Sequence, residues 1–217
     1  MVISDFTASF THLSKIWITV LCLTYGPSAS ANDPKILVFG DSISAAYGME
    51  PEQGWVQLMS DKLKQDGSHY TVINASVSGE TTGGGLVRLP KTLDVHQPNI
   101  LILELGGNDG LRGYPIDKIK SNLNQMIEMA AVEDIQVLLV GMVLPPNYGR
   151  RYTLAFQNSF ADVATGQKIA LVPHLLEGVT TPRDLMQQDG IHPRAEAQWM
   201  IVEDIYPLLK PLMNSDK

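Results

Sequence analysis

The sequence of 217 residues has only one cysteine, and aromatic residues make up only 7% of it. A single cysteine cannot form an internal disulfide, and no Cys/His cluster has the spacing of zinc ligands. Basic residues are also scarce, with 16 Lys+Arg against 23 Asp+Glu and a formal net charge of −7. No Lys/Arg cluster is available to neutralise phosphates, which argues against a nucleic-acid partner.

Long apolar runs and internal repeats are missing as well. The apolar run at residues 16–23 falls well short of the ~20 residues that a membrane-spanning helix needs. With 44% hydrophobic and 18% charged residues, the composition is that of a globular protein, which excludes collagen-like, disordered and polytopic membrane classes. No repeat, low-complexity tract or Pro/Ser linker divides residues 32–217, so we expect a single domain there.

The N-terminal segment has the three parts of a secretory signal peptide. A lysine precedes the short apolar core at residues 16–23, and a small-x-small cleavage site follows at residues 29–31. We therefore predict a signal peptide over residues 1–31, cleaved near Ala31, and an exported protein. Cleavage would remove Cys22, the only cysteine, which suits an oxidising compartment. The alternative is that the segment is retained as an anchor.

Short aliphatic runs bounded by Gly, Asn or Pro alternate with segments of helical periodicity. The runs are nearly uninterrupted, as is typical of strands buried on both faces of a parallel sheet. Strands that alternate with helices predict βαβ units and a three-layer α/β/α sandwich, whose sites form at the carboxyl ends of the strands. The expected strands are residues 36–39, 70–73, 100–103, 135–140 and 169–172, and the expected helices are residues 54–65, 116–131, 150–166 and 195–210.

Small polar residues follow the expected strands at the points where those strands end. Residues 40–44 follow the first strand, residues 74–80 the second and residues 106–110 the third, while residues 189–193 precede the last helix. These four segments should meet at one edge of the sheet. The triple glycine at residues 83–85 lacks the Gly-Lys-Ser/Thr of a phosphate-binding loop, and we expect a flexible loop there.

The residue types in these segments are those that acyl transfer requires. A serine hydroxyl becomes a good nucleophile when a neighbouring base takes its proton, and that base is most often a histidine oriented by a carboxylate. We expect Ser42 to be the nucleophile, on a strand-to-helix turn where a helix N-terminus favours negative charge. His192 would be the base and Asp189 would orient it. The oxyanion would be bound by the backbone N–H groups of Ser42 and Gly79 and by the side-chain amide of Asn108.

Taken together, the segments resemble the SGNH (GDSL) hydrolases. The likeness rests on GDSIS at residues 40–44, the isolated Gly79, GGND at residues 106–109 and DGIHP at residues 189–193, and it covers nearly all of residues 35–210. It implies a flavodoxin-like sheet of five parallel strands and assigns the same catalytic and oxyanion roles as above. It also implies a periplasmic esterase or thioesterase without metal or cofactor. The implied substrates are small-molecule acyl esters or thioesters, including aryl esters, short-to-medium acyl thioesters and lysophospholipids.

The acyl pocket is expected to lie between the loops after the third and fourth strands, at residues 111–115 and 142–148. Both loops mix apolar side chains with Gly or Pro, which suits an acyl groove with a movable lip. The alternative is that these side chains merely cover the end of the sheet. The predicted substrate-binding residues are Leu111, Leu144, Pro145 and Tyr148.

Other functions could use similar residues. A carbohydrate O-deacetylase would share the four segments but should carry polar and sugar-stacking aromatic residues in place of Leu111 and residues 142–148. A non-catalytic flavodoxin-like binding domain would not depend on Ser42. Glu104 and Asp109 could suggest the paired carboxylates of a glycosidase, but nothing in the sequence orders that pair.

Two details complete the expectations from sequence. Ser44 stands where a Gly-x-Ser-x-Gly nucleophile elbow has its second glycine, so we expect a looser turn and a more open site. His69, His96 and His174 have no motif partner, and we expect them to be surface or structural residues. We further expect a monomer that does not insert stably into a membrane.

Overall fold

The aliphatic runs of the sequence form the five strands of one sheet. The computed structural model describes residues 33–179 and 183–214, so the predicted signal peptide lies outside the described residues. All neighbouring strands are parallel. The strands are β1 (Lys35–Gly40), β2 (Thr71–Asn74), β3 (Ile100–Glu104), β4 (Gln136–Val140) and β5 (Ala170–Val172).

The strand order is β2-β1-β3-β4-β5. This is the flavodoxin-like order, which confirms the fold that the family resemblance implies. β2 pairs with one edge of β1, and β3 pairs with the other edge. The connections that leave β1 and β2 therefore run in opposite directions across the sheet. In open parallel sheets, ligands bind in the crevice that this reversal creates beyond the carboxyl ends of the strands.

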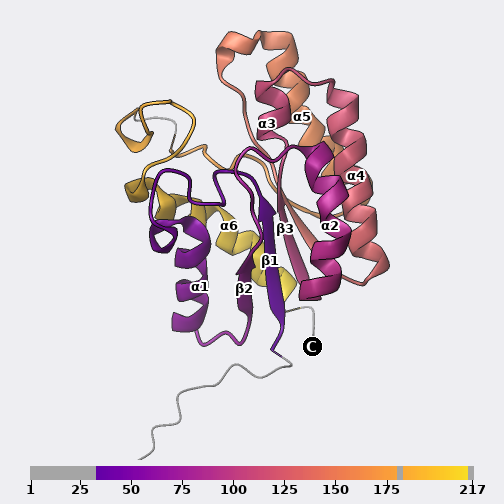
Figure 1. Cartoon of the computed structure of the whole chain (residues 1–217), viewed down its shortest axis with the longest axis vertical. Coiled ribbons are helices and arrows are strands. Elements are labelled where there is room, and N and C mark those ends of the chain that lie inside the picture. Colours follow the sequence, from indigo (N-terminus) through magenta and orange to yellow (C-terminus); the bar gives the residue numbers. More distant parts are fainter. Residues whose placement is uncertain (1–32, 180–182, 215–217) are drawn as a thin grey trace, which may run out of the picture. The chain divides into compact units, whose positions relative to one another are not determined.

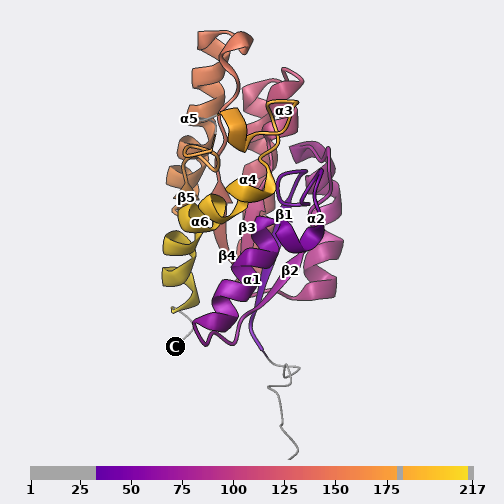
Figure 2. The ribbon, with the colours of Figure 1, turned by 90° about the vertical axis from the view of Figure 1, so that its left-hand side faces the viewer.

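The described part of the chain has six α-helices, and five of them cover the two faces of the sheet. Helices α1 and α6 lie on one face, and α2, α4 and α5 lie on the other (Figure 1). The view in Figure 2 brings α1 and α6 in front of the strands. The helices are α1 (Trp55–Gln65), α2 (Thr82–His96), α3 (Gly107–Leu111), α4 (Ile116–Val132), α5 (Arg150–Gln167) and α6 (Gln198–Met213).

Each central strand contributes to two separate hydrophobic clusters. In β1, Leu37 and Phe39 belong to the cluster under α2, α4 and α5, whereas Ile36 and Val38 belong to the cluster under α1 and α6. All four side chains are fully buried. Because successive side chains point to opposite faces of a strand, burial on both faces requires the uninterrupted apolar pattern that the sequence shows. The predicted three-layer α/β/α sandwich is therefore confirmed.

Helix α2 corrects one expectation. Residues 83–85, expected as a flexible loop, lie in its first turn. The Thr81 side chain accepts a hydrogen bond from the Gly84 N–H and caps the helix, and Leu89 and Leu93 are fully buried. Packing of this apolar face outweighs the poor helix propensity of three glycines, because most helical stability in proteins comes from tertiary packing.

The C-terminal helix also differs in detail from its expected range of residues 195–210. A short 3-10 helix spans residues 195–197, and α6 then continues to Met213 with Pro207 and Pro211 inside it. Among the described residues, no helix combines the length and the apolarity required to cross a membrane.

Candidate active site

Ser42 lies just beyond the carboxyl end of β1, in a series of turns that we call the nucleophile turn (residues 41–47). The Ala45 N–H donates to the Asp41 carbonyl at 2.9 Å, and the Tyr47 N–H donates to the Ser42 carbonyl at 3.1 Å. Between the end of β1 and Trp55, no residue belongs to an α-helix. The expectation that Ser42 stands at a helix N-terminus is therefore wrong: Ala46, four residues after the serine, has φ of 57° and interrupts the helical conformation.

The nucleophile turn brings the Ser42 hydroxyl to His192. The Ser42 Oγ lies 2.8 Å from His192 Nε2, and His192 Nδ1 lies 2.7 Å from Asp189 Oδ2. A carboxylate only accepts hydrogen bonds, so the ring proton belongs on Nδ1. Nε2 then accepts the hydrogen bond from the serine hydroxyl. This is the geometry in which a histidine can take the serine proton.

Asp189 is fixed by its own loop. Its Oδ1 accepts hydrogen bonds from the backbone N–H groups of Ile191 at 2.9 Å and His192 at 3.0 Å, while Oδ2 faces the imidazole. Desolvation raises the pKa of Asp189, but the hydrogen bonds from His192 and Ile191 outweigh it and lower this pKa to about 2. The carboxylate is therefore charged at any pH at which the histidine acts as a base.

Sequence reasoning missed the residue that joins this loop to the nucleophile turn. The Gln187 amide donates to the carbonyl of Tyr47 at 2.8 Å, and the Gln187 N–H donates to the carbonyl of His192 at 2.8 Å. The Tyr47 and His192 rings also pack, with centroids 4.4 Å apart. Gln187 lies 140 residues after Tyr47, and no local motif marks it.

Three N–H donors meet beside the serine. The Asn108 side-chain amide donates one hydrogen to Asp41 Oδ2 at 3.0 Å, which leaves its second hydrogen for another acceptor. The backbone N–H groups of Ser42 and Gly79 have no acceptor among the described residues. Gly79 has φ of 80°, a conformation that disfavours other residue types, although a Cβ there would meet open space. Ser42, Gly79 and Asn108 all line one cavity.

A polar network holds the Gly79 loop against α3. The Asp109 carboxylate accepts hydrogen bonds from the Thr82 N–H at 2.8 Å and the Thr82 hydroxyl at 2.6 Å, at the start of α2. Arg112 donates to the Gly79 carbonyl at 3.3 Å. Asp109 therefore fixes two strand-end segments relative to one another and is not half of a carboxylate pair with Glu104.

Glu104 is fully buried behind the nucleophile turn. Its Oε2 accepts hydrogen bonds from the Ser44 hydroxyl at 2.6 Å and from the Asp41 N–H at 3.1 Å. Desolvation and the nearby Asp41 charge raise the pKa of Glu104 well above its usual value. Desolvation also raises the pKa of Asp41, to about 6, although hydrogen bonds from Ile43 and Asn108 oppose the rise. Ser44, which replaces the elbow glycine, thus anchors the turn to the sheet.

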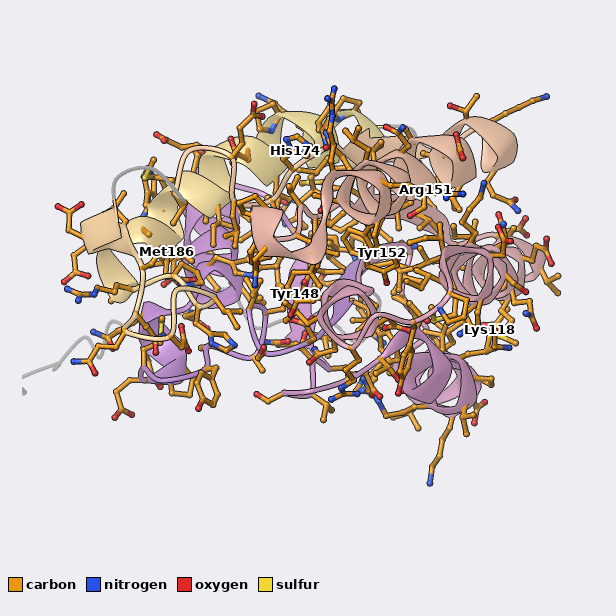
Figure 3. The ribbon with its side chains drawn as sticks, turned by 90° about the horizontal axis from the view of Figure 1, so that it is seen from above. Lys118, Tyr148, Arg151, Tyr152, His174 and Met186 are labelled. Carbon is orange, nitrogen blue, oxygen red and sulfur yellow. The ribbon has the colours of Figure 1, made fainter. Side chains whose placement is uncertain are left out.

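The catalytic groups open into a cavity of about 730 Å³. Figure 3 looks down on this edge of the sheet and labels Met186 and His174, which belong to two of the lining segments. Most lining side chains away from the triad are apolar, and most of these follow β4, follow β5 or precede His192. They include Ile43, Leu111, Met142, Val143, Leu144, Pro145, Pro146, Leu175, Leu176, Met186 and Ile191.

The cavity corrects one expectation, that for Tyr148. Leu111, Leu144 and Pro145 line it, but Tyr148 does not: its hydroxyl donates to the Leu111 carbonyl at 3.1 Å, and its ring packs against the core. His174, expected to be a surface or structural residue, lines the cavity. His69 is exposed, as expected. Within the part of the chain that the structure describes, no three His, Cys, Asp or Glu side chains are grouped to hold a metal ion.

The fold and the site together define a hydrolase with a flavodoxin-like parallel sheet and with a serine, a histidine and an aspartate at the carboxyl edge of that sheet. The sequence matches the GDSL-like lipase/acylhydrolase family over residues 38–200. The chain belongs to this family, and it is a hydrolase that acts on ester bonds.

Three relatives illustrate the likeness. Esterase TesA of Pseudomonas aeruginosa is 49% identical over 178 residues, covering 82% of this chain and 89% of the relative. Thioesterase 1/protease 1/lysophospholipase L1 of Escherichia coli is 38% identical over 205 residues, covering 94% and 95% respectively. The crystal structure of a psychrotrophic esterase EstA from Pseudoalteromonas, inhibited by monoethylphosphonate, superimposes with a TM-score of 0.80 at 39% identity, covering 84% of this chain and all of that one.

Proposed function

We propose that this enzyme hydrolyses acyl esters and thioesters through an acyl-enzyme on Ser42. The observation that carries the proposal is the continuous hydrogen-bonded path from Ser42 Oγ through His192 to Asp189, with steps of 2.8 and 2.7 Å. Three polar groups from two distant segments of the chain are aligned in the order that serine activation requires.

In acylation, Ser42 Oγ attacks the acyl carbon while its proton moves to His192 Nε2. The bond to the leaving oxygen or sulfur then breaks, and Nε2 gives the proton to the leaving alcohol or thiol. In deacylation, a water molecule loses a proton to Nε2 and attacks the acyl carbon, which releases the carboxylic acid and restores the serine hydroxyl. Asp189 keeps the proton of Nδ1 facing it and stabilises the imidazolium formed in each half-reaction.

The tetrahedral intermediate of each half-reaction carries a negative charge on the former carbonyl oxygen. We assign its stabilisation to the N–H groups of Ser42 and Gly79 and to the second amide hydrogen of Asn108. The hydrogen bond between Asn108 and Asp41 supports this assignment, because it orients the amide before the charge develops. Arg112 holds the Gly79 carbonyl and thereby orients the peptide next to it.

The proposed substrates are aryl esters, short-to-medium acyl thioesters and lysophospholipids. The apolar cavity that begins at the triad supports this choice, because an acyl chain gains free energy by leaving water. The Escherichia coli relative is named both a thioesterase and a lysophospholipase, which points to the same chemistry. A carbohydrate O-deacetylase would need polar and sugar-stacking side chains at Leu111 and Leu144, so the apolar lining favours the acyl proposal.

The working unit that we propose is a monomer without metal or cofactor, exported after cleavage near Ala31. Every proposed catalytic group comes from one chain, so the site does not require a second copy. Size-exclusion chromatography with light scattering tests the monomer. Mass spectrometry of the N-terminus in the exported fraction tests the cleavage.

A fluorophosphonate probe tests the proposed nucleophile. The probe should label the purified enzyme once, at Ser42, with loss of hydrolysis of a p-nitrophenyl ester. Ser42→Ala should abolish both labelling and turnover, whereas Ser78→Ala, a second serine that lines the cavity, should keep the label at residue 42. Labelling at another serine, or full turnover by the Ser42→Ala protein, would refute the proposed mechanism.

A further inference from the structure

His174 and the nucleophile line the same cavity from strands that are far apart in the sheet. Ser42 follows β1 and His174 follows β5, and both line the cavity. Three inter-strand steps separate β1 from β5 in the sheet, which corresponds to roughly 14 Å at ~4.8 Å per step. An acyl chain bound to Ser42 that extends past β3 and β4 therefore approaches His174.

The lining between these two residues is apolar. The intervening side chains include Met142 and Leu144, which follow β4, and Leu175, which follows His174. Most other polar lining residues belong to the catalytic end, so His174 and its neighbour Glu177 form a separate polar group on the cavity wall. The residues of the catalytic end are Asp41, Ser42, Tyr47, Ser78, Asn108 and His192.

The contacts of His174 fix its tautomer and its free hydrogen-bonding group. The side-chain nitrogen of Gln157, on α5, lies 2.7 Å from Nε2 of His174. An amide nitrogen only donates, so Nε2 accepts and the ring proton lies on Nδ1. Nδ1 is 3.7 Å from the Glu177 carboxylate, which is longer than a hydrogen bond, and the His174 side chain is 23% exposed. His174, which lines the cavity, therefore keeps a donor beside Glu177 that no acceptor among the described residues meets at hydrogen-bond distance.

We propose that His174 determines the acyl-chain preference of the enzyme by placing a hydrogen-bonding group where the apolar stretch of the cavity wall ends. This inference rests on the proposed hydrolysis of acyl esters. Each methylene that moves from water to the apolar wall should raise kcat/KM about fourfold, until the chain reaches His174. A further methylene would displace water from the imidazole without replacing its hydrogen bond, so the gain should stop there.

The same argument identifies a substrate class that suits this site. An acyl chain with a hydroxyl group at its distal end can accept the hydrogen bond of His174 Nδ1 in place of water. Distally hydroxylated acyl groups should therefore be preferred over plain aliphatic chains of the same length. Shorter chains that end within the apolar part should show no such preference.

The test compares the purified wild-type enzyme with His174→Leu on p-nitrophenyl esters from acetyl to lauroyl. In the wild type, kcat/KM should rise with chain length and then level off. In His174→Leu, it should continue to rise, so that the ratio of the decanoyl to the hexanoyl ester increases about tenfold. His69→Leu, which removes an exposed histidine remote from the cavity, is the matched control and should reproduce the wild-type profile.

A second measurement separates recognition from a merely structural effect. At the chain length where the wild-type profile levels off, the aliphatic ester and its ω-hydroxy counterpart are compared in both enzymes. The wild type should favour the hydroxylated ester, and His174→Leu should reverse this preference, with about a tenfold change in the ratio of kcat/KM values. Local destabilisation would lower both rates together and would leave this ratio unchanged.

The outcomes distinguish this proposal from the proposed function. If His174→Leu and the wild type give superimposable chain-length profiles and equal hydroxyl preference, the role of His174 is refuted, while fluorophosphonate labelling of Ser42 still supports the function. An altered profile in His69→Leu as well would also refute it. If no acyl ester is hydrolysed and Ser42 is not labelled, the proposed function itself fails.

Discussion

At the scale of the residue, Asn108 is the clearest case of a single side chain that we expect to stabilise the oxyanion. Its amide has one hydrogen on Asp41, at 3.0 Å, and one hydrogen for the oxyanion. Asn108→Ala removes a donor that acts mainly in the transition state. We therefore expect kcat for p-nitrophenyl esters to fall by ~100–1,000-fold with little change in KM. An unchanged melting temperature shows that the fold is intact, and an unchanged kcat would remove Asn108 from the oxyanion hole.

Asp189 should contribute less to kcat than the nucleophile Ser42 does. Asp189→Asn keeps the base but loses the charge that stabilises the imidazolium and fixes its tautomer. By comparison with other serine hydrolases, we expect a loss of ~10⁴-fold in kcat, against ~10⁶-fold for Ser42→Ala. Steady-state kinetics with an aryl ester measures both. Equal losses would mean that Asp189 does more than orient and stabilise the histidine.

At the scale of elements, the cavity wall depends on how closely two segments approach. The Gly141 N–H, just after β4, donates to the Val172 carbonyl at 2.8 Å, and its carbonyl accepts from the Leu175 N–H at 3.0 Å. A Cβ at residue 141 would lie 2.5 Å from the Pro173 carbonyl oxygen. This contact is with backbone, so a side chain at residue 141 must displace the segment that carries His174.

We therefore expect Gly141→Ala to lower the free energy of unfolding by ~1–3 kcal/mol. It should also lower activity on long acyl esters more than on acetyl esters, because the displaced segment forms the wall furthest from Ser42. Urea denaturation and ester kinetics measure the two effects. Gly166→Ala, in α5 where a Cβ meets nothing within 4 Å, is the control and should be neutral or slightly stabilising. Equal stability of the two variants would contradict the packing argument.

Elements differ in how far the sequence predicts them. The strands were predictable because burial on both faces demands continuous aliphatic runs, as in Ile100–Glu104. Helix α2 was not predictable from local preferences, because residues 83–85 and Pro90 oppose a helix. Its buried face contacts strands that are distant in the sequence, and this packing outweighs the local preference. The same limit applies to α6, which continues through Pro207.

At the scale of the whole molecule, sequence reasoning predicted the residues that the fold gathers but not the contacts that hold them. The motifs at three strand ends and before the last helix were enough to bring Ser42, Asn108 and His192 together. The hydrogen bond from Gln187 to Tyr47 depends on how two loops 140 residues apart meet, which no local pattern records. The place of His174 in the cavity wall was not predictable for the same reason, since its segment reaches the cavity because β5 is the edge strand next to β4. The catalytic roles themselves stay predictions.

The buried carboxyl pair behind Ser42 should make the stability of the whole domain depend on pH. Glu104 is fully buried and Asp41 is 2% exposed, and desolvation raises the pKa of both groups, that of Asp41 from 3.8 to about 6. A group with a raised native pKa holds its proton in the folded state at a pH where the unfolded chain has released it. Folding stability from Asp41 is thus fully present below pH ~4 and is lost as the pH rises through about 6.

The rise in the pKa of Asp41 from 3.8 to about 6 corresponds to ~3 kcal/mol of folding free energy that depends on pH. Asp41→Asn should remove this pH dependence, because an amide does not titrate. The free energy of unfolding of both proteins is measured in urea at pH 4 and at pH 7. Between these two pH values, we expect the wild type to lose about 3 kcal/mol more stability than Asp41→Asn loses. The difference between the two proteins reports the titration of Asp41 together with its effect on Glu104, because the Asp41 charge also raises the pKa of Glu104. A constant difference across this range would show that Asp41 titrates alike in the folded and unfolded chains. Such a result would mean that the negative charge beside the oxyanion donors costs the fold little, so that Asp41 remains ionised, and able to orient Asn108, throughout the range in which His192 acts as a base.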